Sequence, residues 1–311
     1  MGHPHFTVIV PAYRSAATIM TTLRSLTSQT FGDWEALVVD DGSPDDTGKL
    51  IEDYAGEDPR VRLLRQPNSG PAAARNLALA ASRGDLISFL DADDAWMPGY
   101  LERARDALAG EPGAGIGFAD AWPFIDSSKR VYRRTALEDY PPVATRLTPD
   151  GLLEALVVIN FITTSSVTIT RRALETAGSF EETLAGSEDW DLWIRIAESG
   201  FGAVRIGSEP LVLLRDRPTS LSKDEAMMTG HATAVLERAL SRLPAGDVRA
   251  PALRARAAAM QDEADDAAAP GILRRIWWMP AMAPARRLRR RSRVGPPPAA
   301  AAQALRDLGE I

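Results

Sequence analysis

Cysteine is absent from this chain of 311 residues, and histidine occurs only three times. The absence of cysteine excludes disulfides and thiolate metal ligands, and it is typical of proteins in a reducing compartment. The three histidines, His3, His5 and His231, form no recognisable cluster of metal ligands along the sequence.

Long apolar runs are also missing. No window approaches 18 uninterrupted apolar residues, which predicts that no helix spans a membrane. The first residues lead into a strand-like segment without the apolar stretch of a signal peptide. A formal net charge of −6 argues against a general nucleic-acid binder, which normally carries a basic surplus. We therefore expect a cytoplasmic protein that does not bind nucleic acid.

The composition and the apolar pattern predict an α/β domain. Hydrophobic residues make up 45% and charged residues 25%, as in ordinary globular proteins. The length favours one domain of about 220 residues with an appendage. Helical spacing between short apolar runs indicates a parallel sheet with right-handed crossovers. The runs that predict buried strands are Phe6–Pro11, Trp34–Asp40, Val61–Leu64 and Leu86–Leu90.

The pattern is less regular beyond about residue 110. Strands are predicted at Gly115–Ala119, Val167–Thr170 and Leu211–Leu214, and a helix at Glu188–Ser199. Residues 122–149 are interpreted as a loop and variable insertion. From Ala226 onward the pattern predicts helices, and the alanine run after Pro298 is interpreted as a flexible tail.

Polar residues follow three of the predicted strands at the point where each strand ends. Pro11–Tyr13 follows the first, Asp40–Asp41 the second and Asp91–Asp94 the fourth. Because ligands of an open parallel sheet bind outside the carboxyl ends of the strands, these clusters predict one shared site. Neither a G-x-G-x-x-G turn nor a Walker-type lysine loop is present, so phosphate is expected to be held in another way.

The cluster of Asp91, Asp93 and Asp94 offers such a way. Carboxylates are hard oxygen ligands suited to magnesium or manganese, which bridge substrate phosphates. The alternative is a solvated acidic turn, and the three aspartates alone do not decide between the two. Their place directly after a buried strand favours the metal.

A second acidic group, Ser187–Asp191, lies at the predicted start of a helix. The N-terminus of a helix favours ionised carboxylates, which a catalytic base requires. Ser187 as an N-cap with acidic residues in the first turn would equally suit a helix with a structural role alone. From the residues by themselves, both interpretations stay open.

Three stretches carry a family resemblance: VIVPAYRSAATIMTTLRSLTSQTFGDWEALVVDDGSPDDT, QPNSGPAAARNLALAASRGDLISFLDADDAWMPGYL and, further on, GSEDWDLWIR. They resemble glycosyltransferase family 2, the inverting transferases with the nucleotide-diphospho-sugar-binding GT-A fold. The resemblance covers about residues 6–108 and returns at Gly186–Arg195. It implies a Rossmann-like, mainly parallel sheet flanked by helices, with a C-terminal helical extension. It also implies a nucleotide-sugar donor, with a UDP-sugar favoured, and a divalent metal cofactor, Mn²⁺ or Mg²⁺.

Carried over by position, the resemblance assigns the nucleotide to residues at the strand ends. Pro11 and Tyr13 would line the base pocket, with the Tyr13 ring packed on uracil or a similar base. Asp41, and less surely Asp40, would accept a hydrogen bond from the base. Arg75 would reach the nucleotide or its phosphates, a task that suits its planar fork of donors. The alternatives are a half-buried aromatic, aspartates that cap the following helix, and a plain exposed charge.

The same resemblance divides the tasks of the acidic turn. Asp93 is the expected principal metal ligand, Asp91 lies nearer the ribose or sugar, and Asp94 is a substitute ligand. Ala12 and Ala92 complete the expected donor-binding set.

For the base, the resemblance singles out the Glu188–Asp189 pair, and we assign the role to Asp189 with Glu188 as the fallback. Trp190 either stacks on an acceptor sugar or belongs to the core. Many relatives carry a histidine after the last strand, where this chain has Leu214–Arg217. Arg217 can add positive charge near the diphosphate or acceptor but cannot coordinate a metal, so the full metal shell stays open.

The predicted organisation is a catalytic domain at residues 1–225, a helical extension at 226–269 and a basic, tryptophan-containing, partly flexible tail at 270–311. Within the first, residues 1–110 form the nucleotide-binding half and 111–225 the acceptor-binding half. Eight arginines and no acidic residue lie between Pro270 and Pro296, close to Trp277 and Trp278. This pattern suits peripheral contact of residues 272–293 with an anionic membrane surface. Contact with a protein partner, or with the acidic face of its own domain, is the alternative.

These features predict a glycosyltransferase that moves a sugar to an acceptor hydroxyl with inversion, in polysaccharide, glycolipid or glycoprotein assembly. A sugar-phosphate nucleotidyltransferase would need a glycine-rich basic loop after the first strand, and Pro11–Ser15 is not one. A non-catalytic nucleotide-sugar-binding protein would be expected to lose carboxylates, yet the candidate positions are acidic. Residues 122–149 and 160–166 carry no readable code for the sugar or acceptor.

Overall fold

The computed structural model describes residues 3–128, 130–132, 134–140, 142–217, 225–268 and 298–310. A larger sheet contains β1 (Phe6–Ala12), β2 (Trp34–Asp40), β3 (Val61–Arg65), β4 (Leu86–Phe89), β6 (Ala114–Phe118), β9 (Arg146–Leu147), β10 (Val167–Thr170) and β11 (Gly202–Arg205). A smaller sheet contains β5 (Ala95–Trp96), β7 (Ala121–Ile125), β8 (Arg130–Val131) and β12 (Val212–Asp216).

Helices connect and flank these strands. They are α1 (Ile19–Thr27), α2 (Thr47–Glu57), α3 (Gly70–Ala81), α4 (Tyr100–Ala109), α5 (Pro149–Val158), α6 (Arg171–Ala177), α7 (Glu188–Glu198), α8 (Glu225–Arg242), α9 (Ala250–Ala268) and α11 (Ala299–Asp307). Two short 3₁₀ turns, η1 (Leu137–Asp139) and η2 (Thr164–Ser166), complete the described elements.

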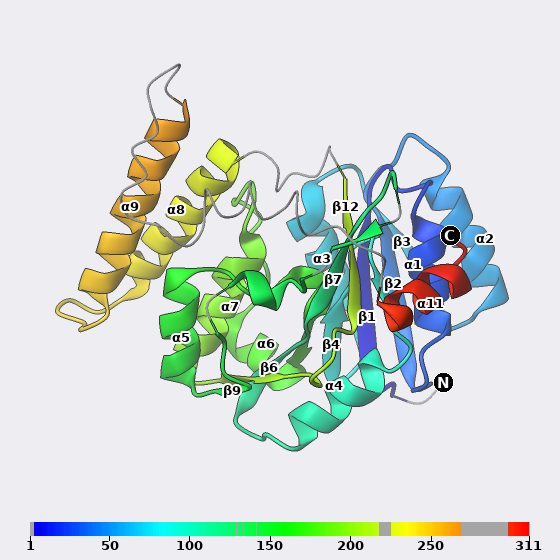
Figure 1. The fold of residues 1–311 in the computed structure, drawn as a ribbon, viewed down its shortest axis with the longest axis horizontal. Helices are drawn as coiled ribbons and strands as arrows, with labels where there is room; N and C mark the ends of the chain where they lie inside the picture. The colour runs from blue at the N-terminus through cyan, green and yellow to red at the C-terminus, as the bar shows by residue number, and fades with distance from the viewer. Residues whose placement is uncertain are drawn as a thin grey trace.

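The larger sheet has the strand order β3-β2-β1-β4-β10-β6-β11-β9 (Figure 1). Strands β1 to β4 are parallel, as the sequence predicts, and every residue of β2 is buried. The β10 strand runs antiparallel to both β4 and β6, so its first residues lie at the edge where β4 ends. This α/β architecture confirms the predicted fold class.

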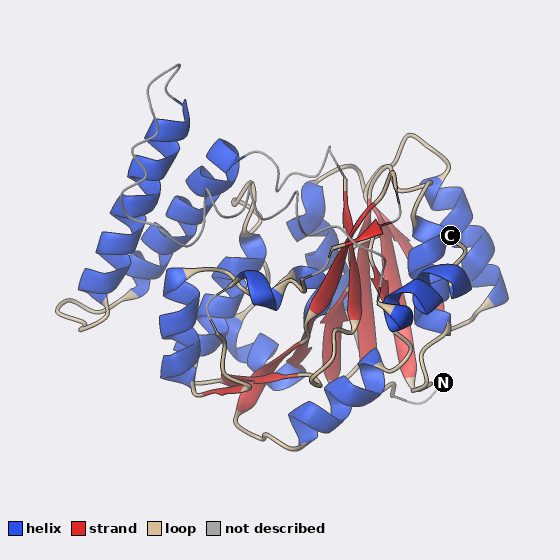
Figure 2. Ribbon diagram, viewed as in Figure 1, coloured by secondary structure: helices blue, strands red, loops and turns tan. Residues whose placement is uncertain are grey.

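Helices cover both faces of this sheet (Figure 2). On one face, α1, α2 and α4 contribute Ile19, Leu23, Ile51 and Leu101 to a core with β1 and β2. On the other face, α3, α5, α6 and α7 form a second core that includes Trp193. Because β1 and β2 are buried on both faces, they read as continuous apolar runs.

The predicted helical extension forms α8 and α9, which continue the second core through Val235 and Leu253. The fully buried Asp191 of α7 is paired with Arg195 of its own helix at 2.8 Å and with Arg242 of α8 at 3.0 Å. These pairs attach the extension to the helix that begins with Glu188 and Asp189.

Residues 122–149 were predicted to form a loop and variable insertion, but they contain strands and a helix. The β7 strand begins at Ala121 and pairs in parallel with β12, and the β8 strand pairs with β7. The strand predicted at Leu211–Leu214 overlaps β12, but β7 and β8 of the same sheet escaped prediction because they are short and β7 contains Pro123, which weakens any strand pattern.

The alanine run near the end of the chain also differs from the prediction of a flexible tail. Residues 299–307 form α11, and Ala301, Ala304, Leu305 and Leu308 pack against the smaller sheet. Small apolar residues at helical spacing allow this close packing, and polyalanine composition alone did not reveal it. The basic segment with Trp277 and Trp278 lies outside the described residues.

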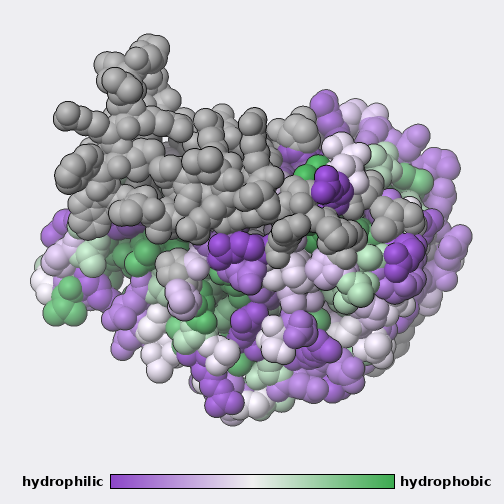
Figure 3. Space-filling model, in the orientation of Figure 1, coloured by the Kyte–Doolittle hydropathy of each residue, from purple (hydrophilic) through white to green (hydrophobic). Residues whose placement is uncertain are grey.

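Polar and apolar side chains are interspersed on the described surface that Figure 3 shows. The large hydrophobic residues exposed in the described part are Tyr13, Leu77, Val158 and Val248. No helix in that part is both long and apolar enough to cross a membrane. Tyr13 stands out among these four because it follows β1 at the edge of the sheet.

Candidate active site

Three strand ends meet at one edge of the larger sheet. The β1 and β2 strands pair in parallel with Ala12 opposite Asp40, and β4 runs parallel on the other side of β1. Tyr13, Asp41 and Asp91 follow these strands, so the structure brings the three predicted clusters to the same edge.

Tyr13 is 44% exposed, whereas Ala12 beside it is buried. The Arg14 guanidinium carbon lies 5.3 Å from the centre of the ring. Arg14 has a left-handed backbone with φ of 51°, and its amide donates to Ser43 Oγ at 3.1 Å. The main chain after β1 is thus fixed to the loop after β2, and an aromatic face is presented at this edge.

The two aspartates after β2 have strong contacts with the protein itself. Asp41 accepts hydrogen bonds from the Ser69 amide at 2.8 Å, the Gly70 amide at 2.9 Å and Gln66 Nε2 at 2.7 Å. It therefore caps α3, and not the nearer α2 that the capping alternative had in view. Asp40 accepts from the Ser43 amide at 2.9 Å.

Arg75 of α3 is buried between carboxylates from the two predicted halves of the domain. Its Nη2 lies 2.9 Å from Asp91 Oδ1, and its Nη1 lies 2.5 Å from Glu188 Oε1. Its guanidinium carbon is 5.4 Å from the centre of the Phe180 ring. Burial opposes the charge, yet Asp91 and Glu188 hold the pKa of Arg75 above its usual value. The alternative that Arg75 is a plain exposed charge is therefore wrong. Its guanidinium pairs with Asp91 and Glu188.

Asp94 is buried, and both of its carboxylate oxygens are used by the protein. Oδ2 accepts from Ser165 Oγ at 2.6 Å, and Oδ1 accepts from the Arg215 amide at 2.8 Å. Burial, together with the charges of Asp93 and Asp91, raises the pKa of Asp94 well above its usual range. The expectation that Asp94 is a substitute metal ligand is therefore not supported, because its oxygens are directed into the protein.

Asp93 is half-buried and forms an ion pair with Arg217, two residues beyond Arg215 at the end of β12. Burial and the neighbouring charge of Asp91 raise the pKa of Asp93, while Arg217 opposes that rise. A guanidinium thus lies beside the expected principal metal ligand, at the position where the sequence departs from its family.

Among the described residues, no group of three or more His, Cys, Asp and Glu side chains is arranged to hold a metal ion. Asp91 and Asp93 are left as partly exposed carboxylates at the edge of the sheet. Two like charges of this kind attract a cation, and their hard oxygens suit Mg²⁺ or Mn²⁺. By this chemistry Asp91 and Asp93 would be able to hold a divalent ion together with ligands from outside the protein.

Glu188 and Asp189 begin α7 beside this edge. Asp189 Oδ2 accepts from Thr164 Oγ1 at 2.8 Å, and its Oδ1 accepts from the Trp190 amide at 2.6 Å. Burial and the adjacent charge of Glu188 raise the pKa of Asp189 to about 6. Ser187 has a left-handed backbone and its side chain makes no capping hydrogen bond, so the simple N-cap interpretation is not borne out.

Trp190 belongs to the core. Its side chain is 3% exposed and its Nε1 donates to the Leu156 carbonyl at 2.9 Å. The alternative of stacking on an acceptor sugar is therefore wrong, because neither face of the buried indole is available to a ligand.

The loop at residues 160–166, in which the sequence carried no readable code, holds residues of the site that were not predicted. Thr164 contacts Asp189, and Ser165 Oγ accepts from the Asp91 amide at 3.1 Å while it donates to Asp94. This loop precedes β10, whose antiparallel direction places it at the site. The short polar run before a predicted strand was the available signal, but strand direction was not readable from it.

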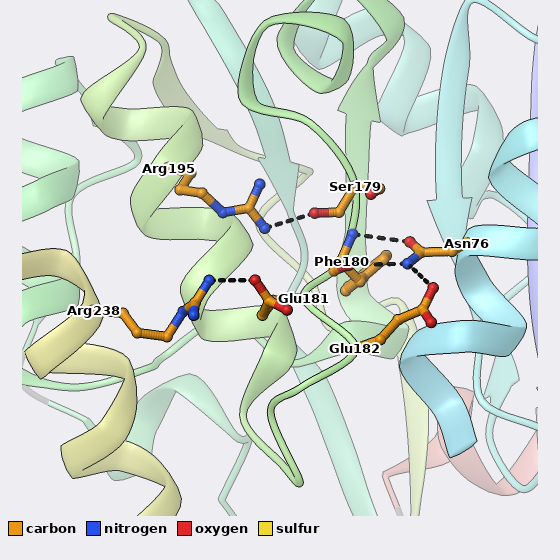
Figure 4. Close-up of a pocket in the computed structure, with 7 residues that line it drawn as sticks. All are labelled: Asn76, Ser179, Phe180, Glu181, Glu182, Arg195 and Arg238. Carbon is orange, nitrogen blue, oxygen red and sulfur yellow. Dashed lines mark hydrogen bonds and ion pairs between the residues drawn. The ribbon is translucent and has the colours of Figure 1, made fainter. Parts of the chain in front are cut away.

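A separate cavity of about 390 Å³ is lined by residues of α3, α7, α8 and the segment before α7 (Figure 4). Its lining residues are Asn76, Ser179, Phe180, Glu181, Glu182, Arg195 and Arg238. None of these was predicted as a site residue, and their polar groups are engaged with one another. The predicted site therefore does not coincide with this cavity.

Comparison with known proteins bears on what this edge does. Residues 7–173, more than half of the chain, match the model of "Glycosyl transferase family 2". The chain belongs to glycosyltransferase family 2. It is 43% identical over 103 residues to an uncharacterized glycosyltransferase, EpsJ, of Bacillus subtilis, a match that covers 33% of this chain and 30% of EpsJ.

The fold of this chain is also similar to that of solved structures. TarS of S. aureus in complex with UDP gives a TM-score of 0.61 at 20% identity, covering 83% of this chain and 71% of TarS. The mannosyltransferase PcManGT of Pyrobaculum calidifontis, in complex with GDP-Man and Mn²⁺, gives 0.59 at 22% identity, covering 88% and 77%. At this identity the likeness establishes the fold and no more.

Replacement of Asp41 tests whether its carboxylate acts as the cap of α3. Asp41→Ala leaves the Ser69 and Gly70 amides without their acceptor, so we expect the free energy of unfolding to fall by about 1–3 kcal/mol. Asp46→Ala is the matched control, because Asp46 is exposed and its side chain makes no capping hydrogen bond with α2. Urea denaturation measures both variants. Equal stability of Asp41→Ala and the control would show that Asp41 is free for another role.

Proposed function

We propose that this chain transfers a sugar from a nucleotide-diphosphate donor to an acceptor hydroxyl with inversion at the anomeric carbon. The observation that carries the proposal is that the buried Arg75 pairs with both Asp91 of the acidic turn and Glu188, which precedes Asp189 in α7. Family membership supports the transferase class, and neighbours of the same fold bind UDP or GDP-Man with Mn²⁺.

On the donor side, each residue has a distinct task. The exposed Tyr13 ring offers a flat apolar face for the base, and Asp40 and Asp41 lie beside it. Asp93, with Asp91, would hold the divalent ion, which neutralises the diphosphate as it leaves. Arg217 places a second positive charge next to Asp93, where the leaving diphosphate gathers negative charge.

On the acceptor side, Asp189 takes the proton. The acceptor oxygen attacks the anomeric carbon, the bond from that carbon to the diphosphate oxygen breaks, and the hydroxyl proton moves to Asp189. A single displacement of this kind inverts the configuration. Thr164 and the Trp190 amide orient the Asp189 carboxylate, and its pKa near 6 suits a base at neutral pH.

Two other functions are less well supported. A nucleotidyltransferase would need a basic, glycine-rich loop after β1, where this chain has Pro-Ala-Tyr-Arg. A binding protein without catalysis would not need a carboxylate with the raised pKa of Asp189. The cytoplasmic location, the membrane contact of residues 272–293 and the type of acceptor stay predictions.

A titration with nucleotides tests the donor site. We expect UDP or GDP to bind more tightly with Mn²⁺ than without it, and the matching sugar nucleotide to be hydrolysed slowly. Asp93→Asn removes the principal metal ligand, so it should weaken the Mn²⁺-dependent binding on the order of 100-fold, about 2.8 kcal/mol. Asp53→Asn, an exposed aspartate paired with Lys49, is the control and should bind as the wild type does. Binding is measured by calorimetry. The proposal is contradicted if neither UDP nor GDP binds, with or without Mn²⁺.

The pH profile of transfer tests the assignment of the base. Because Asp189 must be ionised to accept a proton, kcat/KM should rise with pH through about 6 and level off above it. Glu188→Gln removes a charge that raises the pKa of Asp189, so the rise should move to lower pH. Asp189→Asn should still bind donor but lose transfer.

The two variants also separate the two carboxylates. If Glu188→Gln is inactive and Asp189→Asn is active, the base is Glu188. Loss of donor binding in Asp189→Asn, in parallel with loss of transfer, would assign Asp189 a structural role.

A further inference from the structure

A buried arginine at the end of β12, Arg215, connects the acidic turn to the segment that contains α11. Its side chain is 2% exposed, and its guanidinium carbon lies 4.9 Å from the centre of the Phe124 ring. Nη1 lies 2.6 Å from Asp126 Oδ1, and Nη2 lies 2.5 Å from Glu310 Oε1. Because a buried guanidinium is tolerated only when its charge is paired, these two carboxylates determine where it lies.

The remaining donors of Arg215 hold the acidic turn. Its Nε donates to the Asp93 carbonyl at 2.8 Å, and its amide donates to Asp94 Oδ1 at 2.8 Å. The carbonyl and the carboxylate of Asp93 share one α-carbon, so fixing the carbonyl restricts where the carboxylate can point. These contacts are made to the turn, which means that Arg215 acts on the ligand-binding residue and not on a ligand.

Glu310 is held in place from two sides. Its side chain is 8% exposed, and Oε1 also accepts from Thr21 Oγ1 of α1 at 2.6 Å. The helix before it packs on the smaller sheet through Leu305 and Leu308. The position of Glu310 is thus set by the docking of α11 and by α1, and it can in turn set the position of Arg215.

We propose that Glu310 positions the metal- and donor-binding turn through Arg215, which makes the segment 298–310 a part of the donor site's support. This inference rests on the proposed function of Asp93. The guanidinium is rigid and planar. Because Glu310 and Asp126 hold its two Nη atoms, they also fix the direction of the Nε–H that donates to the Asp93 carbonyl. Partners that orient metal ligands in this manner affect metal affinity without touching the metal.

The test compares Glu310→Gln with a matched change at the end of α11, three residues earlier in the chain. Glu310→Gln keeps the size of the side chain but removes the charge that pairs with Arg215. Asp307→Asn is the control, because Asp307 is the last residue of α11 and accepts a hydrogen bond from the exposed Gln303. Asp126→Asn removes the other carboxylate on Arg215 and should act in the same direction as Glu310→Gln.

Two readouts are needed, with thermal denaturation as a check that each variant is folded. We expect Glu310→Gln to accelerate hydrogen exchange of the amides at residues 91–97 and to weaken binding of UDP with Mn²⁺ by about tenfold. Asp307→Asn should leave both unchanged. If the acidic turn is displaced in Glu310→Gln, the KM for the donor should also rise, with little change in kcat.

Several outcomes overturn the inference. The inference fails if Glu310→Gln shows the hydrogen exchange and the UDP binding of the wild type. It also fails if hydrogen exchange becomes faster but UDP binding is unchanged. Equal losses in Asp307→Asn would show a general effect of the helix and overturn it as well. A wild-type protein that binds no UDP with Mn²⁺ contradicts the proposed function instead, and hydrogen exchange then still decides whether Glu310 holds the turn.

Discussion

The buried guanidinium of Arg75 is the contact on which the arrangement of the site depends. A cation in the interior requires carboxylates within hydrogen-bond distance, and the two that it has come from different parts of the fold. Asp91 follows β4 and Glu188 begins α7, so one side chain of α3 ties the donor edge to the helix that carries the proposed base. If either carboxylate moved away, Arg75 would be left underpaired in the core. The separation between the acidic turn at Asp91–Asp94 and Asp189 is therefore fixed by charge pairing as well as by packing.

The acidic residues around this edge divide into two groups by how far they are buried. Asp41 and Asp94 have their oxygens occupied by main-chain amides and hydroxyl or amide side chains, and they hold α3 and β12 in place. Asp93 and Asp189 are only partly buried and have raised pKa values, although Asp189 also accepts from Thr164 and from the Trp190 amide. Because burial and like charges raise the free energy of these ionised groups, a metal ion or an acceptor proton would relieve it. Residues that look equivalent in the sequence thus differ in how far the fold buries them.

Much of this could be predicted from the sequence, and the reasons are specific. The strands at Phe6–Ala12 and Trp34–Asp40 are mostly apolar because both faces are buried, and the carboxyl-edge rule then brought Tyr13, Asp41 and Asp91 together. What escaped prediction depends on long-range contacts. The partners of Arg75 lie 16 and 113 residues away, Asp94 is turned inward by Ser165 and Arg215, and Trp190 is covered by α5. The role of Glu310 depends on how α11 docks, which composition does not encode.

The most direct test of this account is a crystal structure of the protein with UDP and Mn²⁺. We expect the base against the Tyr13 ring, Asp93 within about 2.1 Å of the metal, and Arg75 still between Asp91 and Glu188. A nucleotide bound away from the strand ends would contradict the site, and an Arg75 that leaves both carboxylates to bind the phosphates would contradict its role as the buried link.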